Sequence, residues 1–213
     1  MAQTDTSLLD PARNYVRKII RQFAKLLNKI TVGKLTPNMV TLTGLVAHIP
    51  IALLIATRHD LIGAILLVIF GLFDTLDGEL ARLQNRSSSR GMVLDAVTDR
   101  YKEVMLYTAV GYNLISIGQP YLAVWAILAC GASLSVSYVK AKGEATYLAK
   151  HKDVAPNTLF KDGLMRFEIR IVILILGLLT NYVGEAIIII AVLASFTAIS
   201  RLIRVSKKLD VQD

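Results

Sequence analysis

An uninterrupted apolar run of thirteen residues, 61–73, leads directly into Asp74, Asp77 and Arg82. A bilayer core requires about 20 residues of helix, so this run needs the residues after it to complete a membrane span. A helix that continues to residue 83 must turn its charged face toward protein or water, because a charge facing lipid is costly. The segment therefore predicts a membrane helix with a functional polar face near one end.

Five more apolar stretches can be recognised along the chain. They cover residues 40–56, 92–111, 121–139, 169–181 and 186–203. The chain of 213 residues is 54% hydrophobic, with a mean hydropathy of +0.53, which is more apolar than a soluble domain of this size. We therefore predict an all-α integral membrane protein. It forms a single domain over residues 1–213, with a bundle of six transmembrane helices over residues 38–205.

Positive charge is distributed unevenly between the two predicted membrane sides. The opposite side carries only Arg58, and the connections 113–120 and 180–185 contain no Lys or Arg. The remaining basic segments precede the first span, follow the second and fourth, and follow the last. Cytoplasmic loops carry such an excess, so both termini and the polar face are expected at the cytoplasmic side of the cell membrane. The net charge of +8, with only 7% aromatic residues, favours contact with membrane lipids over nucleic acid.

Residues 11–34 form a separate amphipathic element before the first span. Its apolar residues recur at helical spacing with basic residues between them, namely Ile19, Ile20, Phe23, Leu26, Leu27 and Ile30. This pattern fits an interfacial helix in the headgroup layer, and equally a helix packed on the protein. Thr36 and Pro37 then predict the cap and first turn of the first span.

Four aspartates occupy two neighbouring predicted helices. Asp74 and Asp77 are three residues apart, and Asp95 and Asp99 are four apart, so each pair lies on one helical face. A short polar turn between the helices brings the pairs together near the cytoplasmic surface. Four carboxylates in one space repel one another, and divalent cations relieve that repulsion. Because the cluster has no His or Cys, Mg²⁺ or Mn²⁺ is expected rather than zinc.

The spacing of this region resembles a known family signature. DTLDGELAR, eight residues, and then GMVLDAVTD resemble the pattern D-x2-D-G-x2-A-R-x8-G-x3-D-x3-D of the CDP-alcohol phosphatidyltransferases. Every fixed position is present, namely Asp74, Asp77, Gly78, Ala81, Arg82, Gly91, Asp95 and Asp99. The six-span layout and basic amphipathic start also resemble that family.

The resemblance implies an activity and roles for individual residues. The family cleaves the pyrophosphate of a CDP-linked lipid, releases CMP and joins the remaining phosphoryl group to an acceptor hydroxyl. Asp99 would be the general base, and all four aspartates would hold two metal ions, Mg²⁺ or Mn²⁺. The CDP-lipid would contact Pro37, Asn38, Met39, Val40, Gly78, Arg82 and Ser88. The family also often forms homodimers.

Basic residues later in the chain bear on the acceptor. SYVKAKGE, residues 137–144, and RFEIR, residues 166–170, resemble segments of phosphatidylinositol phosphate synthases and their archaeal counterparts. There, the basic residues bind inositol phosphate, which implies a phosphorylated acceptor held by Lys140, Lys142, Arg166 and Arg170. The resemblance departs at Lys142, Gly143 and Ile169, where that group carries Arg, Ala and Arg.

Three alternatives remain open at this stage. Glycerol 3-phosphate as acceptor would make the protein a phosphatidylglycerophosphate synthase. A membrane cation transporter would also place carboxylates within the membrane, but it does not require Gly78, Ala81 and Arg82 at fixed spacing. A non-catalytic lipid-binding protein would have no need of Asp99.

Overall fold

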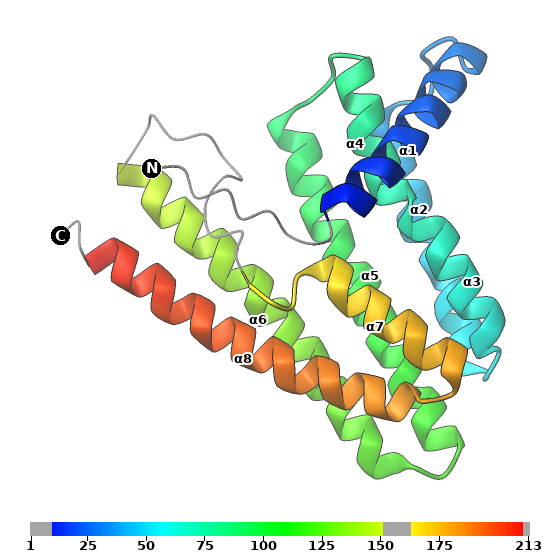
Figure 1. Cartoon of the computed structure of the whole chain (residues 1–213), viewed down its shortest axis with the longest axis vertical. Helices are drawn as coiled ribbons and strands as arrows, with labels where there is room; N and C mark the ends of the chain where they lie inside the picture. Colours follow the sequence, from blue (N-terminus) through cyan, green and yellow to red (C-terminus); the bar gives the residue numbers. More distant parts are fainter. Residues whose placement is uncertain (1–9, 151–162, 211–213) are drawn as a thin grey trace. The chain divides into compact units, whose positions relative to one another are not determined.

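The computed structural model describes residues 10–150 and 163–210, which form eight α-helices and no β-strand (Figure 1). The helices are α1 (Asp10–Ile30), α2 (Pro37–Ala56), α3 (Asp60–Gly71), α4 (Phe73–Leu83), α5 (Ser89–Ser116), α6 (Pro120–Lys150), α7 (Phe167–Thr180) and α8 (Val183–Asp210). Only Leu72 separates α3 from α4. The predicted all-α class is therefore confirmed.

The six apolar stretches fall largely on helices, but within residues 10–150 and 163–210 only four helical segments are both long and apolar enough to span a membrane. These are Pro37–Ala56, Asp60–Leu83, Pro120–Ala149 and Val183–Leu209. The predicted third span, in α5, carries several charged residues in its first half, and α7 has only 14 residues. A bilayer core needs about 20 residues of helix, so α7 is short for a span standing upright in the membrane.

The structure divides into two compact units, each assembled from separate parts of the chain. Of the described residues, the first unit contains 10–49 and 66–102, and the second contains 50–65, 103–150 and 163–210. Three helices contribute to both units, because the divisions fall within α2, α3 and α5. Each unit has its own packing.

In the first unit, α1 packs on α4. Ile20 and Ala24 of α1 are buried together with Leu76 and Leu80 of α4 and Val40 of α2. Burying apolar side chains stabilises a fold by about 1.5–3 kcal/mol for each large residue, so this cluster anchors the amphipathic helix. Of the two predictions for residues 11–34, an interfacial helix or a helix packed on the protein, the structure shows the packing on the protein.

A second apolar strip of α1 remains uncovered. Ile19, Phe23, Leu26 and Ile30 are each at least half exposed. A helix that packs one apolar strip and exposes a second beside basic residues suits the headgroup layer of a membrane. Packing of α1 on the protein is thus compatible with the predicted position of this helix in the headgroup layer.

The start of α2 follows the sequence expectation. Thr36 accepts a hydrogen bond at its Oγ1 from the backbone N–H of Met39, at 3.3 Å, which caps the first turn. Pro37 begins the helix, where its missing N–H costs nothing. The predicted cap at Thr36 is confirmed.

In the second unit, α8 packs along α6 and α7 (Figure 1). Arg201 of α8 donates to the backbone oxygen of Val136 in α6 at 2.7 Å. The turn from α7 to α8 is tight, because a Cβ on Gly177 would collide with Ala186 and approach the backbone oxygen of Tyr182 at 3.2 Å. Glycine at this position lets the two helices approach closely.

Candidate active site

The four aspartates lie in the first unit, on α4 and α5. Asp77 is buried, while Asp74, Asp95 and Asp99 are partly exposed. Electrostatic repulsion acts between helices, from Asp77 to Asp95 and from Asp74 to Asp99. The polar turn between α4 and α5 thus brings carboxylates of the two pairs near each other.

A lysine that sequence reasoning did not include lies among these carboxylates. The fully buried Lys102 donates from Nζ to Asp74 Oδ1 and to Asp99 Oδ1, the latter at 3.3 Å. Lys102 lies three residues after Asp99 and therefore on the same helical face. One ammonium group connects the acidic face of α4 with that of α5.

Thr41 is a second polar partner of the cluster. Its hydroxyl donates to Asp77 Oδ2 at 2.6 Å, within a buried setting. Thr41 lies one turn after Pro37 on α2, so the start of α2 fixes the orientation of one aspartate. A charged acceptor makes this hydrogen bond stronger than a neutral one.

The signature arginine, Arg82, is held by a neighbouring glutamate. Its Nη2 donates to Glu79 Oε1 at 2.6 Å, and Arg17 of α1 donates to the same oxygen at 3.1 Å. Glu79 is buried, whereas about half of the Arg82 side chain is exposed. The guanidinium also lies over Gly78, where an added Cβ would be 3.6 Å from Arg82 Nη2. Arg82 is therefore oriented while retaining access to solvent.

Ser88 and Asn38, both predicted to contact CDP, lie beside Gly91. The Ser88 Oγ accepts a hydrogen bond from the Gly91 backbone N–H at 3.1 Å. A Cβ on Gly91 would lie 3.3 Å from Ser88 Oγ and 3.4 Å from Asn38 Oδ1. Met39 is exposed, but Val40 is buried in the core between α1 and α4. Of the predicted 37–40 stretch, Asn38 is thus placed beside residues of the signature.

The donor set suits a hard divalent cation, although the side chains do not surround one as they stand. Over residues 10–150 and 163–210, no three His, Cys, Asp or Glu side chains are grouped closely enough to hold a metal ion. Asp74 and Asp99 nevertheless attract one cation already, the ammonium of Lys102. Carboxylate oxygens that share a cation across two helices have the chemistry that Mg²⁺ and Mn²⁺ prefer.

The four predicted acceptor residues lie in the second unit and differ in their surroundings. Lys142, near the end of α6, is exposed, and Lys140 and Arg166 are partly exposed. Arg170 is only 1% exposed, and its Nε donates to Glu103 Oε1 at 2.8 Å. It also donates to the backbone oxygen of Met165. Arg170 is therefore engaged within the protein, which its sequence pattern did not indicate.

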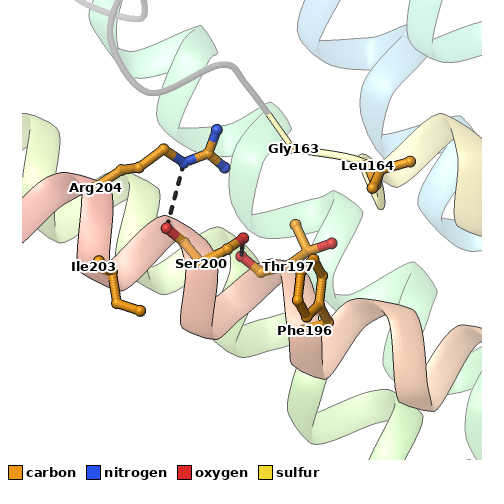
Figure 2. A pocket seen from close by; sticks show the side chains of 7 residues that line it. All are labelled: Gly163, Leu164, Phe196, Thr197, Ser200, Ile203 and Arg204. Atoms are coloured by element: carbon orange, nitrogen blue, oxygen red, sulfur yellow. Dashed lines mark hydrogen bonds between the residues drawn. The ribbon is translucent and has the colours of Figure 1, made fainter.

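A cavity of about 630 Å³ also belongs to the second unit (Figure 2). It is lined by Gly163, Leu164, Phe196, Thr197, Ser200, Ile203 and Arg204. In Figure 2, the Nε of Arg204 donates to the backbone oxygen of Ser200 at 3.3 Å, which is the ordinary reach of one helical turn. None of the predicted site residues lines this cavity.

Sequence reasoning missed Lys102, Thr41 and Glu79 as parts of the site. A signal existed for Lys102, because a lysine within an apolar span needs an acidic partner and Asp99 lies three residues before it. Glu79 and Arg82 also stand at pairing distance along one helix. Thr41 gave no such signal, since its partner Asp77 is 36 residues away.

A family model agrees with the signature. The model described as CDP-alcohol phosphatidyltransferase matches residues 34–198, more than three quarters of the chain. The match includes the start of α2, all four aspartates and the four predicted acceptor residues.

Individual relatives carry related names. The chain is 39% identical over 137 residues to the phosphatidylinositol phosphate synthase of Corynebacterium glutamicum, a match that covers 63% of this chain and 61% of that relative's length. It is 30% identical over 218 residues to the archaetidylinositol phosphate synthase of Methanothermobacter thermautotrophicus, covering 98% of this chain and all of that one.

Two solved structures have a similar fold. The phosphatidylinositol phosphate synthase of Mycobacterium tuberculosis with CDP-DAG bound has a TM-score of 0.75 at 25% identity, covering 88% of this chain and 94% of that chain. A structure of the same enzyme in complex with manganese and citrate also gives 0.75 at 25% identity, covering 87% and 88%.

Proposed function

The chain belongs to the CDP-alcohol phosphatidyltransferase family, and we propose that it transfers a phosphatidyl-type group from a CDP-linked lipid to the hydroxyl of inositol phosphate, with release of CMP. The donor would be CDP-diacylglycerol or CDP-archaeol. One observation supports this proposal most directly. Asp74 of α4 and Asp99 of α5 both contact the ammonium group of Lys102, and both belong to a complete family signature.

The donor site would follow the signature along α4. Arg82, fixed by Glu79 and lying over Gly78, would contact the pyrophosphate as a planar multi-donor cation. Asn38 and Ser88, which lie together beside Gly91, would contact the nucleotide end. The apolar faces of α2, α3 and α4 would leave the lipid chains in the bilayer while the headgroup reacts.

The reaction exchanges one phosphoester partner for another. The acceptor oxygen bonds to the lipid-side phosphorus, the bond from that phosphorus to the bridging oxygen breaks, and CMP leaves with that oxygen. Asp99 takes the proton of the attacking hydroxyl. Two divalent cations, Mg²⁺ or Mn²⁺, would offset the negative charge of the pyrophosphate when bound. They would be held by Asp74, Asp77, Asp95 and Asp99.

The acceptor site would draw on the basic residues of the second unit. Lys140, Lys142 and Arg166 would attract the phosphate of the acceptor, since each is at least partly exposed. Arg170 would support the start of α7 through Glu103 and bind acceptor only after exchanging that partner. The names of the relatives, which include bacterial and archaeal inositol phosphate enzymes, favour inositol phosphate over glycerol 3-phosphate.

The membrane arrangement completes the proposal. Six spans would form if α5 and α7 joined the four long apolar segments. With an interfacial α1, they would place both termini and the aspartates at the cytoplasmic side of the cell membrane. The protein would work as a single domain over the whole chain and as a homodimer. A cation transporter explains the aspartates alone, but not the arginine and glycine held beside them.

A direct assay distinguishes the candidate acceptors. Purified protein with CDP-diacylglycerol and Mn²⁺ would be given inositol 1-phosphate, glycerol 3-phosphate, inositol, serine or glycerol, and CMP would be measured. We expect release with inositol 1-phosphate. Release only with glycerol 3-phosphate would replace the acceptor, and no release with any acceptor or with CDP-archaeol would overturn the enzymatic proposal.

A further inference from the structure

Lys102 lies among the four aspartates but occupies no fixed position of the family signature. Its side chain is fully buried, with carboxylates of two different helices at its ammonium group. Charges are buried in proteins only when they are paired, and breaking such a pair is strongly unfavourable. The ammonium of Lys102 therefore lies where the proposed reaction requires divalent cations.

The surroundings define where this side chain lies. Gly44 of α2 passes beside it, so that an added Cβ would be 3.9 Å from Lys102 Nζ and 3.7 Å from Phe73 Cβ. A methyl group at this position would thus meet the ammonium at ordinary van der Waals distance, which places α2 next to Lys102. Three helices thus enclose Lys102, and its two acidic partners hold it across the gap between α4 and α5.

The ammonium and a divalent cation would compete for the same two carboxylates, those of Asp74 and Asp99. Mg²⁺ binds carboxylate oxygen at about 2.0–2.1 Å and tolerates little distortion. An ammonium that keeps its hydrogen bonds to Asp74 and Asp99 would then lie a few ångströms from the ion, where two positive charges repel strongly. Binding of the ion to these carboxylates therefore requires Lys102 to release at least one of them.

We propose, on the premise of the function proposed above, that Lys102 is a positioning residue that acts as an exchangeable counter-ion. In the metal-free protein it holds Asp74 and Asp99 together and keeps the cluster from separating by repulsion. A divalent cation takes over these contacts and displaces the ammonium. The affinity of the site for metal is therefore set by this exchange as well as by the four carboxylates.

The test compares the full-length protein with Lys102→Met, which keeps the apolar stem and removes the charge. Thermal unfolding in detergent and titration with Mn²⁺, followed by its paramagnetic resonance signal, need neither CDP-lipid nor acceptor. Without metal, the midpoint temperature of thermal unfolding should be lower in Lys102→Met than in the unaltered protein by at least about 4 °C. The dissociation constant for Mn²⁺ should decrease by about tenfold or more. Saturating Mn²⁺ should then raise the midpoint more in the variant than in the unaltered protein.

Two control variants separate the exchange from general charge effects. Lys25→Met removes an exposed lysine of α1 and should leave the affinity for Mn²⁺ unchanged. Lys102→Arg keeps the positive charge and should not tighten binding. If Lys102→Met fails to fold, Lys102→Gln undergoes the same measurements, and a variant that folds only with Mn²⁺ supports the proposal.

The possible failures point to different conclusions. A folded Lys102→Met whose affinity for Mn²⁺ equals that of the unaltered protein would overturn the exchange and leave the metal site in place. No Mn²⁺ binding by either protein would overturn the proposed metal site together with the exchange. Failure of both Lys102 variants to fold even in Mn²⁺ would also overturn it, because a displaced lysine cannot be essential to the metal-loaded fold.

Discussion

Lys102 and Glu103 are consecutive residues of α5, and both are fully buried and paired, yet they belong to different kinds of charge group. Lys102 lies in the first unit, where one ammonium contacts two carboxylates of a cluster of four. Glu103 lies in the second unit, where its Oε1 accepts from Arg170 at 2.8 Å. The first group contains four carboxylates, whereas the second contains the buried ion pair between Glu103 and Arg170.

The difference separates a binding site from a structural contact. Lys102 and Arg100, whose Nη2 lies 3.8 Å from Asp99 Oδ2, offset only part of the charge of four carboxylates, so the cluster retains attraction for further cations. A buried ion pair loses much stability when one partner is removed. We therefore interpret the charge of Asp74 and Asp99 as functional, and the buried pair of Glu103 and Arg170 as structural.

The largest expected effect is on catalysis by the aspartate cluster. Asp99→Asn keeps the size of the side chain and removes its capacity to take a proton, so CMP release should fall by about 10²–10⁴-fold. Binding of the CDP-lipid, measured as a thermal shift, should persist because Arg82, Asn38 and Ser88 are unchanged. An active Asp99→Asn protein would contradict the assignment of the general base.

Arg170→Met should act on stability instead. It removes the guanidinium from which the buried Glu103 accepts, and breaking a buried ion pair costs about 3–5 kcal/mol of unfolding free energy. Denaturant unfolding in detergent measures this loss. A stable variant with a raised KM for inositol phosphate would reverse the interpretation and make Arg170 an acceptor ligand, as the sequence pattern first suggested.

A double variant sharpens the result for Arg170. Glu103→Leu combined with Arg170→Met removes both charges and supplies apolar side chains. Replacing both members of a buried pair in this way is often nearly neutral, so the double variant should recover much of the lost stability. A double variant as unstable as Arg170→Met would show that the loss does not come from an unpaired Glu103.

Thr41→Val should have an intermediate effect on the candidate site. It removes the hydroxyl that donates to the buried Asp77 and leaves that carboxylate short of one hydrogen bond, at a cost of about 1–3 kcal/mol. Affinity for Mn²⁺ should change as well, because Asp77 loses its orientation. Thr57→Val, at an exposed threonine, provides the matched control, and equal effects from both would remove Thr41 from the site.

Tyr107→Phe should have the smallest effect. The Tyr107 hydroxyl lies 3.1 Å from the Ser133 hydroxyl within the buried part of the second unit. Losing that hydrogen bond should lower unfolding free energy by about 1 kcal/mol. Affinity for Mn²⁺ should be unchanged. A clear change in that affinity would contradict the interpretation that the aspartate cluster and the Glu103–Arg170 pair act independently.

Much of the helical framework could be predicted from local sequence. The apolar stretches each became helical because residues of one segment supply both the periodicity and the length. Thr36 capped α2 as expected, since a cap depends on residues three apart. The four aspartates were found for the same reason, because spacing along a helix determines which side chains share a face.

Contacts between distant segments were beyond that reasoning. The choice of Glu103 as partner for Arg170 joins residues 67 positions apart, and nothing in the local pattern distinguishes this arginine from the basic residues beside it. Likewise, the packing of Ile20 and Ala24 on α4 depended on which strip of α1 met a partner.

The sequence by itself determined that the chain forms apolar helices and that four carboxylates occupy two of them in the spacing of one enzyme family. Tertiary structure decided which polar groups pair: the charges of Lys102 with Asp74 and Asp99 and of Arg170 with Glu103, and the hydroxyl of Thr41 with Asp77. Helical periodicity fixes the face on which a side chain lies, whereas a buried charge takes its partner from whatever helix packs against that face.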